Sequence, residues 1–155
     1  MRMSDFVVRE AILPNLLSTS KEEVIREMVA SLRASGHIKA TAEDNIIRAI
    51  LKREELGSTG IGRGVAIPHT KHDSVERPIG TVAVSKSGVD FKSLDNEPVF
   101  IFVMLISPQD RPSEHLRALE NVARCLRDDT FCRFLRQANS REDIWELLTE
   151  NETPR

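Results

Sequence analysis

Two of the four histidines lie where an imidazole could carry out chemistry. In "GVAIPHT" a short apolar run ends with His69, directly after Pro68. Proline has a fixed backbone φ angle, so the direction in which His69 projects is restricted. His115 lies in "RPSEHLRAL", in the first turn of an expected helix that Ser113 would cap. Free N–H groups there favour an anion and a neutral imidazole, so His115 could donate to a phosphate oxygen.

Other interpretations of these histidines stay open. His69 could simply end a core strand, and His115 could be a surface residue of a helix. A zinc site could combine His69, His72, Asp73 and His115. However, His69 and His72 lie in an expected loop, not on a helix that would fix both rings, and no cysteine pair supports the site. We therefore expect no metal.

A glycine-rich segment, "GSTGIGRG", precedes His69 and invites comparison with nucleotide-binding loops. It lacks the Gly-Lys-Ser/Thr of a phosphate-binding loop, and Val65 stands where a dinucleotide fingerprint needs glycine or alanine. Both motifs also open a helix, whereas this segment leads into an expected strand. A flexible connector is the simpler alternative, but four glycines so close together predict backbone at positive φ or a close approach of the main chain.

Helices are expected on both sides of a central block of strands. A capping-box pattern at Ser20–Glu23 predicts a helix that ends near Gly36, and a second helix is expected from about Thr41 to Gly57. After the strands, apolar stripes predict helices around 113–126 and 131–135. A last helix is expected from Ser140, within a capping pattern that reaches Asp143.

Four stretches between these helices are expected to be strands. "VAIPHT" is short and extended because proline disfavours a helical conformation in the preceding residue. "IGTVAVS" and "VDF" flank Ser87-Gly88 and predict a hairpin. "VFIFVMLI", residues 99–106, predicts a central strand buried on both faces. The predicted fold is an α/β (α+β) layered domain with a mixed sheet of about five strands flanked by helices.

Composition limits the remaining classes of protein. The 155 residues predict one domain over 1–155, with an ordered core of about 8–150 and a frayed tail at 151–155. A net charge of −2 argues against a nucleic-acid surface, and no apolar run is long enough to insert in a membrane, so we expect a cytoplasmic protein. Cys125 and Cys132 are seven residues apart, which places both on one helix face as buried apolar groups.

The segment "KREELGSTGIGRGVAIPHTK" closely resembles the phosphorylation-site signature of enzyme IIA of the fructose/mannitol/nitrogen class, from the bacterial phosphoenolpyruvate-dependent phosphotransferase system (PTS). The resemblance continues through "LDNEPVFIFVMLISP", "EHLRALENVARCLRD" and "SREDIWELL". It implies a PTS IIA fold in which His69 accepts a phosphoryl group through Nε2, Arg53 holds its oxygens and His115 stabilises it. The chain departs from the family pattern at Arg63, where asparagine is common, and at Thr70, where glycine is common.

The resemblance also implies partners. The donor would be the histidine-containing carrier HPr or its nitrogen-branch analogue, and the acceptor a IIB partner or a regulatory target. Because donor and acceptor are protein side chains, no cofactor is implied. We expect a protein-histidine phosphotransferase, with nitrogen regulation slightly favoured over fructose-type sugar uptake because no IIB or membrane domain is attached. A regulatory module without turnover and a metal-dependent hydrolase are the alternatives.

Overall fold

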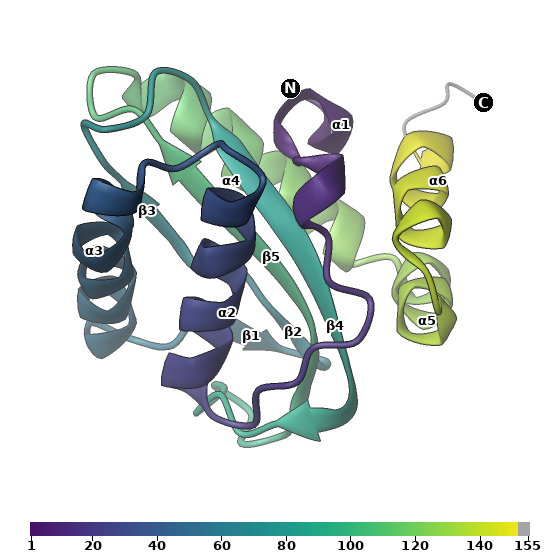
Figure 1. Cartoon of the computed structure of the whole chain (residues 1–155). Helices are drawn as coiled ribbons and strands as arrows, with labels where there is room; N and C mark the ends of the chain where they lie inside the picture. The colour runs from purple at the N-terminus through teal and green to yellow at the C-terminus, as the bar shows by residue number, and fades with distance from the viewer. Residues whose placement is uncertain (152–155) are drawn as a thin grey trace.

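The strand β5 (Val99–Ser107) is the centre of a mixed sheet in the computed structural model, which describes residues 1–151. Along one edge β4 (Ile79–Val89) pairs with it antiparallel. On the other edge β2 (Val65–Ala66) and β3 (His69–Lys71) both pair parallel with β5, and β1 (Gly60–Gly62) pairs antiparallel with β2. Figure 1 shows helices on both faces of this sheet. The predicted mixed sheet of about five strands is confirmed for the described residues.

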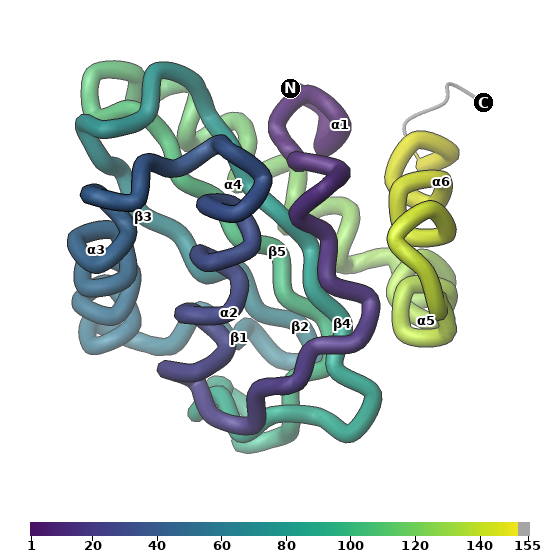
Figure 2. Tube along the Cα trace, viewed as in Figure 1, coloured from purple at the N-terminus to yellow at the C-terminus, as the bar shows by residue number. Residues whose placement is uncertain are grey.

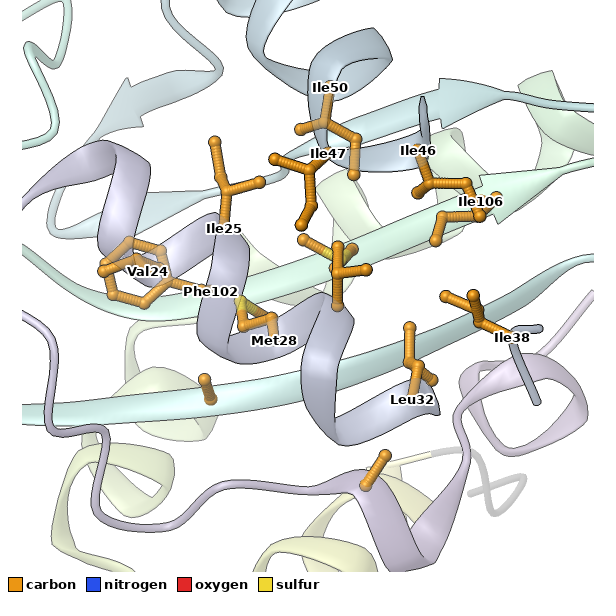
Figure 3. Close-up of a cluster of buried hydrophobic side chains, with 14 of the residues drawn as sticks. Val24, Ile25, Met28, Leu32, Ile38, Ile46, Ile47, Ile50, Phe102 and Ile106 are labelled. Carbon is orange, nitrogen blue, oxygen red and sulfur yellow. The ribbon is translucent and has the colours of Figure 1, made fainter. Parts of the chain in front are cut away.

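Alternate side chains of β5 enter two separate hydrophobic cores. Phe102, Met104 and Ile106 lie in the first core, under α2 (Lys21–Ala34) and α3 (Glu43–Glu55), and Figure 3 shows part of it. A strand covered on both faces needs apolar residues at successive positions. The continuous apolar run of β5 therefore follows from its central place, and this prediction is confirmed.

The second core lies under the C-terminal helices. These are α4 (Pro112–Leu126), α5 (Asp129–Gln137) and α6 (Arg141–Asn151). Ile101 and Leu105 enter it from β5. None of the helices in residues 1–151 is both long and apolar enough to cross a membrane.

The N-terminal segment covers the outer edge of β4 (Figure 2). It contains α1 (Met3–Phe6) and the 3-10 turn η1 (Arg9–Ala11). The Val8 N–H donates to Gly80 O at 2.8 Å, and the Leu13 N–H donates to Val82 O at 2.9 Å. An open strand edge invites pairing with another chain, so this cover protects the sheet.

Two predicted features of the strands are wrong. Ser87-Gly88 is not a hairpin turn: β4 continues through both residues to Val89, with an irregular register against β5. The Gly88 N–H donates to Ser85 Oγ at 3.0 Å, and Gly88 has a positive φ of 86°. Glycine therefore serves a local irregularity within one strand here, and not a turn between two strands. The glycine-rich segment is not all loop either, because Gly60–Gly62 forms β1.

Most helix boundaries follow the predicted caps. Ser20 Oγ accepts from the Glu23 N–H, and Ser140 Oγ accepts from the Asp143 N–H. The second helix begins as the 3-10 turn η2 (Ala40–Ala42) before α3. Ser113 does not cap α4: that helix begins at Pro112 after Arg111, with no side-chain cap.

Two further predictions in the C-terminal part need correction. Cys125 and Cys132 are both buried thiols, but they belong to α4 and α5, because the chain turns between them. Asn151 ends α6 and so is not part of a frayed tail, whereas residues 152–155 lie outside the described part of the chain.

Candidate active site

His69 is the first residue of β3, and the backbone directly before it is hydrogen-bonded to the central strand. Pro68 O accepts a hydrogen bond from the Leu105 N–H at 3.0 Å, which ties this short edge segment to the central strand. The ring is half-buried, and its Nδ1 lies 2.7 Å from Ile67 O. A carbonyl oxygen can only accept, so Nδ1 carries the proton and Nε2 keeps its lone pair. The structure thus leaves the nucleophilic nitrogen expected from the sequence unprotonated.

His115 lies beside His69, although it belongs to the helix α4 that follows β5. It lies in α4, and its Nδ1 is 2.6 Å from Oγ of Ser107, the last residue of β5. The centroids of the His69 and His115 rings are 5.6 Å apart, with 49° between their planes. Two histidines 46 residues apart in the sequence therefore share one site. His115 is buried, so the interpretation as a surface helical histidine is wrong.

Both imidazoles are neutral near neutral pH. Burial lowers the pKa of His69, and the nearby Arg53 charge lowers it further, against the opposing effect of the hydrogen bond to Ile67. Burial also lowers the pKa of His115 to about 4, helped by His69 and Lys71. A neutral imidazole is a nucleophile, whereas a protonated one is not. The site therefore suits covalent attack by a histidine nitrogen.

Arg53 lies in the last turn of α3, close enough for its charge to affect His69. One guanidinium nitrogen, Nη1, donates to Gly57 O at 2.9 Å, which directs the side chain over the start of the glycine-rich segment. A guanidinium group has five N–H donors in a planar fork, and this bond uses one. Arg53 can therefore hold oxygens of an anion beside His69.

A buried carboxylate beside Arg53 was missed by the sequence analysis. The Glu54 side chain is 2% exposed and accepts hydrogen bonds from Lys21 Nζ at 2.8 Å and from the Thr59 N–H at 3.2 Å. The Thr59 hydroxyl donates to its other oxygen. The Arg-Glu pair of the motif carried the signal, but only its arginine was assigned a role. Glu54 connects α2, α3 and the glycine-rich segment, and so positions Arg53.

The glycine-rich segment is a defined turn, not a flexible connector. Gly62, Arg63 and Gly64 have φ angles of 101°, 61° and 80°. A side chain on Gly60 would place its Cβ 3.0 Å from atoms of Ser93, so the main chain passes very close there. Both effects were predicted from the density of glycines, and both are confirmed. The positive φ at Arg63 is a backbone conformation that asparagine adopts more readily than arginine does.

The four proposed zinc ligands do not converge. Within residues 1–151 no three His, Cys, Asp or Glu side chains are grouped so that they could hold a metal ion. His72 instead lies in the loop after β3, where its Nδ1 is 2.7 Å from Ser74 Oγ. His72 and Asp73 therefore do not form a metal site with His69 and His115.

Comparison with known families identifies the family of the chain. The family described as "Phosphoenolpyruvate-dependent sugar phosphotransferase system, EIIA 2" matches residues 5–151 of this chain. The chain belongs to this family. The EIIA family predicted from the sequence is therefore confirmed, and with it a phosphotransferase role.

Individual proteins show the same relationship. A nitrogen regulatory protein from Bradyrhizobium diazoefficiens is 35% identical over 148 residues, which cover 96% of this chain and 95% of that protein. A fructose-specific EIIABC component of the PTS from Bacillus subtilis is 34% identical over 152 residues, 98% of this chain but 24% of that protein. The crystal structure of the nitrogen regulatory protein IIA-Ntr from Neisseria meningitidis superposes with a TM-score of 0.84 at 27% identity, covering 94% of this chain and 98% of the other.

Proposed function

We propose that this EIIA protein is a phosphocarrier that accepts a phosphoryl group on Nε2 of His69. The observation that carries the proposal is the hydrogen bond from His69 Nδ1 to Ile67 O, which leaves the Nε2 lone pair available. In the transfer, Nε2 attacks phosphorus as the N–P bond of the donor phosphohistidine breaks. No proton has to move, because each imidazole keeps the N–H on its other nitrogen. Transfer to an acceptor reverses the step at His69.

Two neighbours of His69 stabilise the phosphoryl oxygens in this proposal. The Arg53 fork binds oxygens through charge-assisted hydrogen bonds. His115 Nδ1 lies 2.6 Å from Ser107 Oγ; in this proposal the hydroxyl donates to Nδ1, and His115 Nε2 carries the proton that it donates to another oxygen. Phosphoryl transfer depends mainly on such positioning and on charge stabilisation. This chemistry uses side chains alone and needs no metal or nucleotide.

The relatives support particular partners. The proposed donor is HPr or its nitrogen-branch analogue, and the proposed acceptor is a IIB protein or a regulatory target, all in the cytoplasm. The EIIABC relative joins its A part to B and C parts in one chain, which supports a IIB acceptor. Relatives named nitrogen regulatory proteins match over nearly their whole length, which favours a regulatory role over sugar uptake. Labelling rates from HPr and from its nitrogen-branch analogue would separate the two roles.

Replacement of His69 tests the proposal directly. The wild-type chain, incubated with phosphoenolpyruvate, enzyme I and a cognate carrier, should gain one acid-labile phosphoryl group, measured by intact mass. His69→Ala should gain none, because the attacking nitrogen is absent. His72→Ala, outside the site, should label like the wild type. Labelling of His69→Ala at the wild-type rate would show that another residue is the acceptor.

A further inference from the structure

A second concave site lies away from His69, beside the beginning of β5. A cleft of about 500 Å³ is formed between the β1–β2 turn, the end of β4 and α5, and we call it the Arg63 cleft. Arg63, Lys86, Arg133 and Arg136 line it together with one carboxylate, Asp129. His69 pairs with Leu105 near the opposite end of β5. The cleft is therefore separate from the histidine pair.

Two of the cations in the Arg63 cleft are held in place by α5 and the residues around it. Arg63 Nη2 donates to Arg127 O at 2.9 Å and pairs with Asp129. Lys86 Nζ donates to the backbone oxygens of Arg136 and Ala138, at the C-terminal end of α5. These bonds fix the positive charges before any ligand arrives, which reduces the entropy lost on binding.

The other two cations have free donors. The Arg136 guanidinium lies 3.8 Å from the centre of the Phe100 ring, and that of Arg133 lies 5.7 Å from the centre of the Phe134 ring. In the part of the chain that the structure describes, neither guanidinium forms a hydrogen bond or an ion pair. Stacking on an aromatic face leaves the edge of the group, with its N–H donors, able to bind a ligand.

We propose that the Arg63 cleft binds a small phosphate-bearing anion with two or more negative charges, independently of transfer at His69. Four cations face one carboxylate, and guanidinium forks match the oxygens of a phosphate group. The volume is within the range of small-molecule pockets, which favours a small ligand over a protein surface.

Calorimetric titration of the full chain with pyrophosphate and with ADP, at constant ionic strength, tests this proposal. We expect saturable binding of one anion per chain. Arg136→Gln and Arg63→Asn should each weaken it about tenfold, since each removes a charge-assisted hydrogen bond. Asparagine also tolerates the positive φ at residue 63, so that variant should fold. Arg48→Gln, an exposed change on α3, should bind like the wild type.

Further variants distinguish this site from the phosphoryl-transfer site. His69→Ala should bind pyrophosphate normally, so a failure of the phosphocarrier proposal leaves this one standing. Binding that is lost in Arg53→Gln but kept in both Arg136→Gln and Arg63→Asn would place the anion beside His69 and overturn the proposal. Absence of saturable binding would also overturn it, as would binding of hexaglutamate without binding of pyrophosphate, which would indicate an acidic peptide ligand.

Discussion

At the scale of single residues, the chemistry depends on how each imidazole is held. The His69 Nδ1–H donates a hydrogen bond to the backbone oxygen of Ile67, two residues earlier in the same short segment. His115 is held by a hydroxyl at the end of the central strand. Ile67 lies in the link between β2 and β3, and Ser107 ends β5, so both rings are oriented by the sheet and its connections before a phosphoryl donor binds. In the proposed function this orientation lowers the barrier to transfer.

Arg53 should matter for transfer much more than for folding. Arg53→Ala removes the guanidinium fork, and loss of charge-assisted bonds of about 1.5–3 kcal/mol should slow phosphoryl transfer by about 10–100-fold. The side chain is only half-buried, so the melting temperature should change by no more than about 2 °C. Rates of label uptake and thermal melts measure the two effects. A large decrease in the melting temperature that accompanies the slower transfer would show that Arg53 is a structural residue.

The low pKa of His115 makes stability depend on pH. In the folded chain His115 takes up its proton only near pH 4, whereas its ordinary pKa is 6.5. Between these values the unfolded state binds more protons, so the free energy of unfolding falls as the pH decreases from about 6.5 to about 4. Urea unfolding at about pH 7 and about pH 5 measures this loss. His115→Asn should lose less stability over the same interval, and an unchanged loss would point to other groups.

At the scale of elements, Glu54 connects the helix that bears Arg53 to the rest of the site. Its carboxylate accepts hydrogen bonds from Lys21 in α2 and from the Thr59 N–H in the segment after α3. Lys21 Nζ also lies 4.7 Å from the centre of the Phe91 ring. A buried carboxylate is stable only when it is paired and hydrogen-bonded. The turn that leads to His69 is thereby fixed to two helices.

Loss of the Glu54 charge should affect both stability and transfer. Glu54→Gln leaves Lys21 without its buried partner and should reduce the free energy of unfolding by about 2–4 kcal/mol. Phosphoryl transfer should also slow, because Arg53 is less well positioned. Glu22→Gln is the matched control: Glu22 pairs with Arg26 on the exposed side of α2, and its loss should change stability by less than about 0.5 kcal/mol. Urea unfolding compares the two variants, and equal effects would contradict the proposed role of Glu54.

At the scale of the whole molecule, the two cores share β5. Residues that alternate along one strand enter the layer of α2 and α3 or the layer of α4 to α6. A substitution that destabilises one layer of helices should therefore also destabilise the packing of β5 against the other layer. The protein should unfold in a single transition.

Phe102→Ala tests this coupling. Phe102 is fully buried in the first core, and its loss should reduce the free energy of unfolding by about 3–5 kcal/mol. Trp145, the one tryptophan, lies in α6 beside the second core. Its fluorescence and the far-UV circular dichroism should shift to the same lower urea midpoint. Phe134→Ala, at an exposed position, should shift both by little. A tryptophan transition that keeps its wild-type midpoint would show that the layers unfold separately.

The local features of this protein were determined by its sequence. Caps at Ser20 and Ser140 and the positive-φ turn around Arg63 depend on interactions between near neighbours. Such interactions follow from residue type and spacing. The resemblance to the family motif likewise predicted Arg53, His69 and His115 as one site, and the structure places the two histidine rings 5.6 Å apart.

The tertiary structure decided what depends on residues far apart in the sequence. Gly88 looked like a hairpin turn, but the pairing of β4 with β5 makes it a kink within one strand. The role of Glu54 depends on Lys21, which is 33 residues earlier in the sequence and donates a hydrogen bond to its carboxylate. The Arg63 cleft likewise combines residues from three elements. A hydrogen bond or a cleft between distant segments requires their docking in space, and local propensities carry no information about which segments dock.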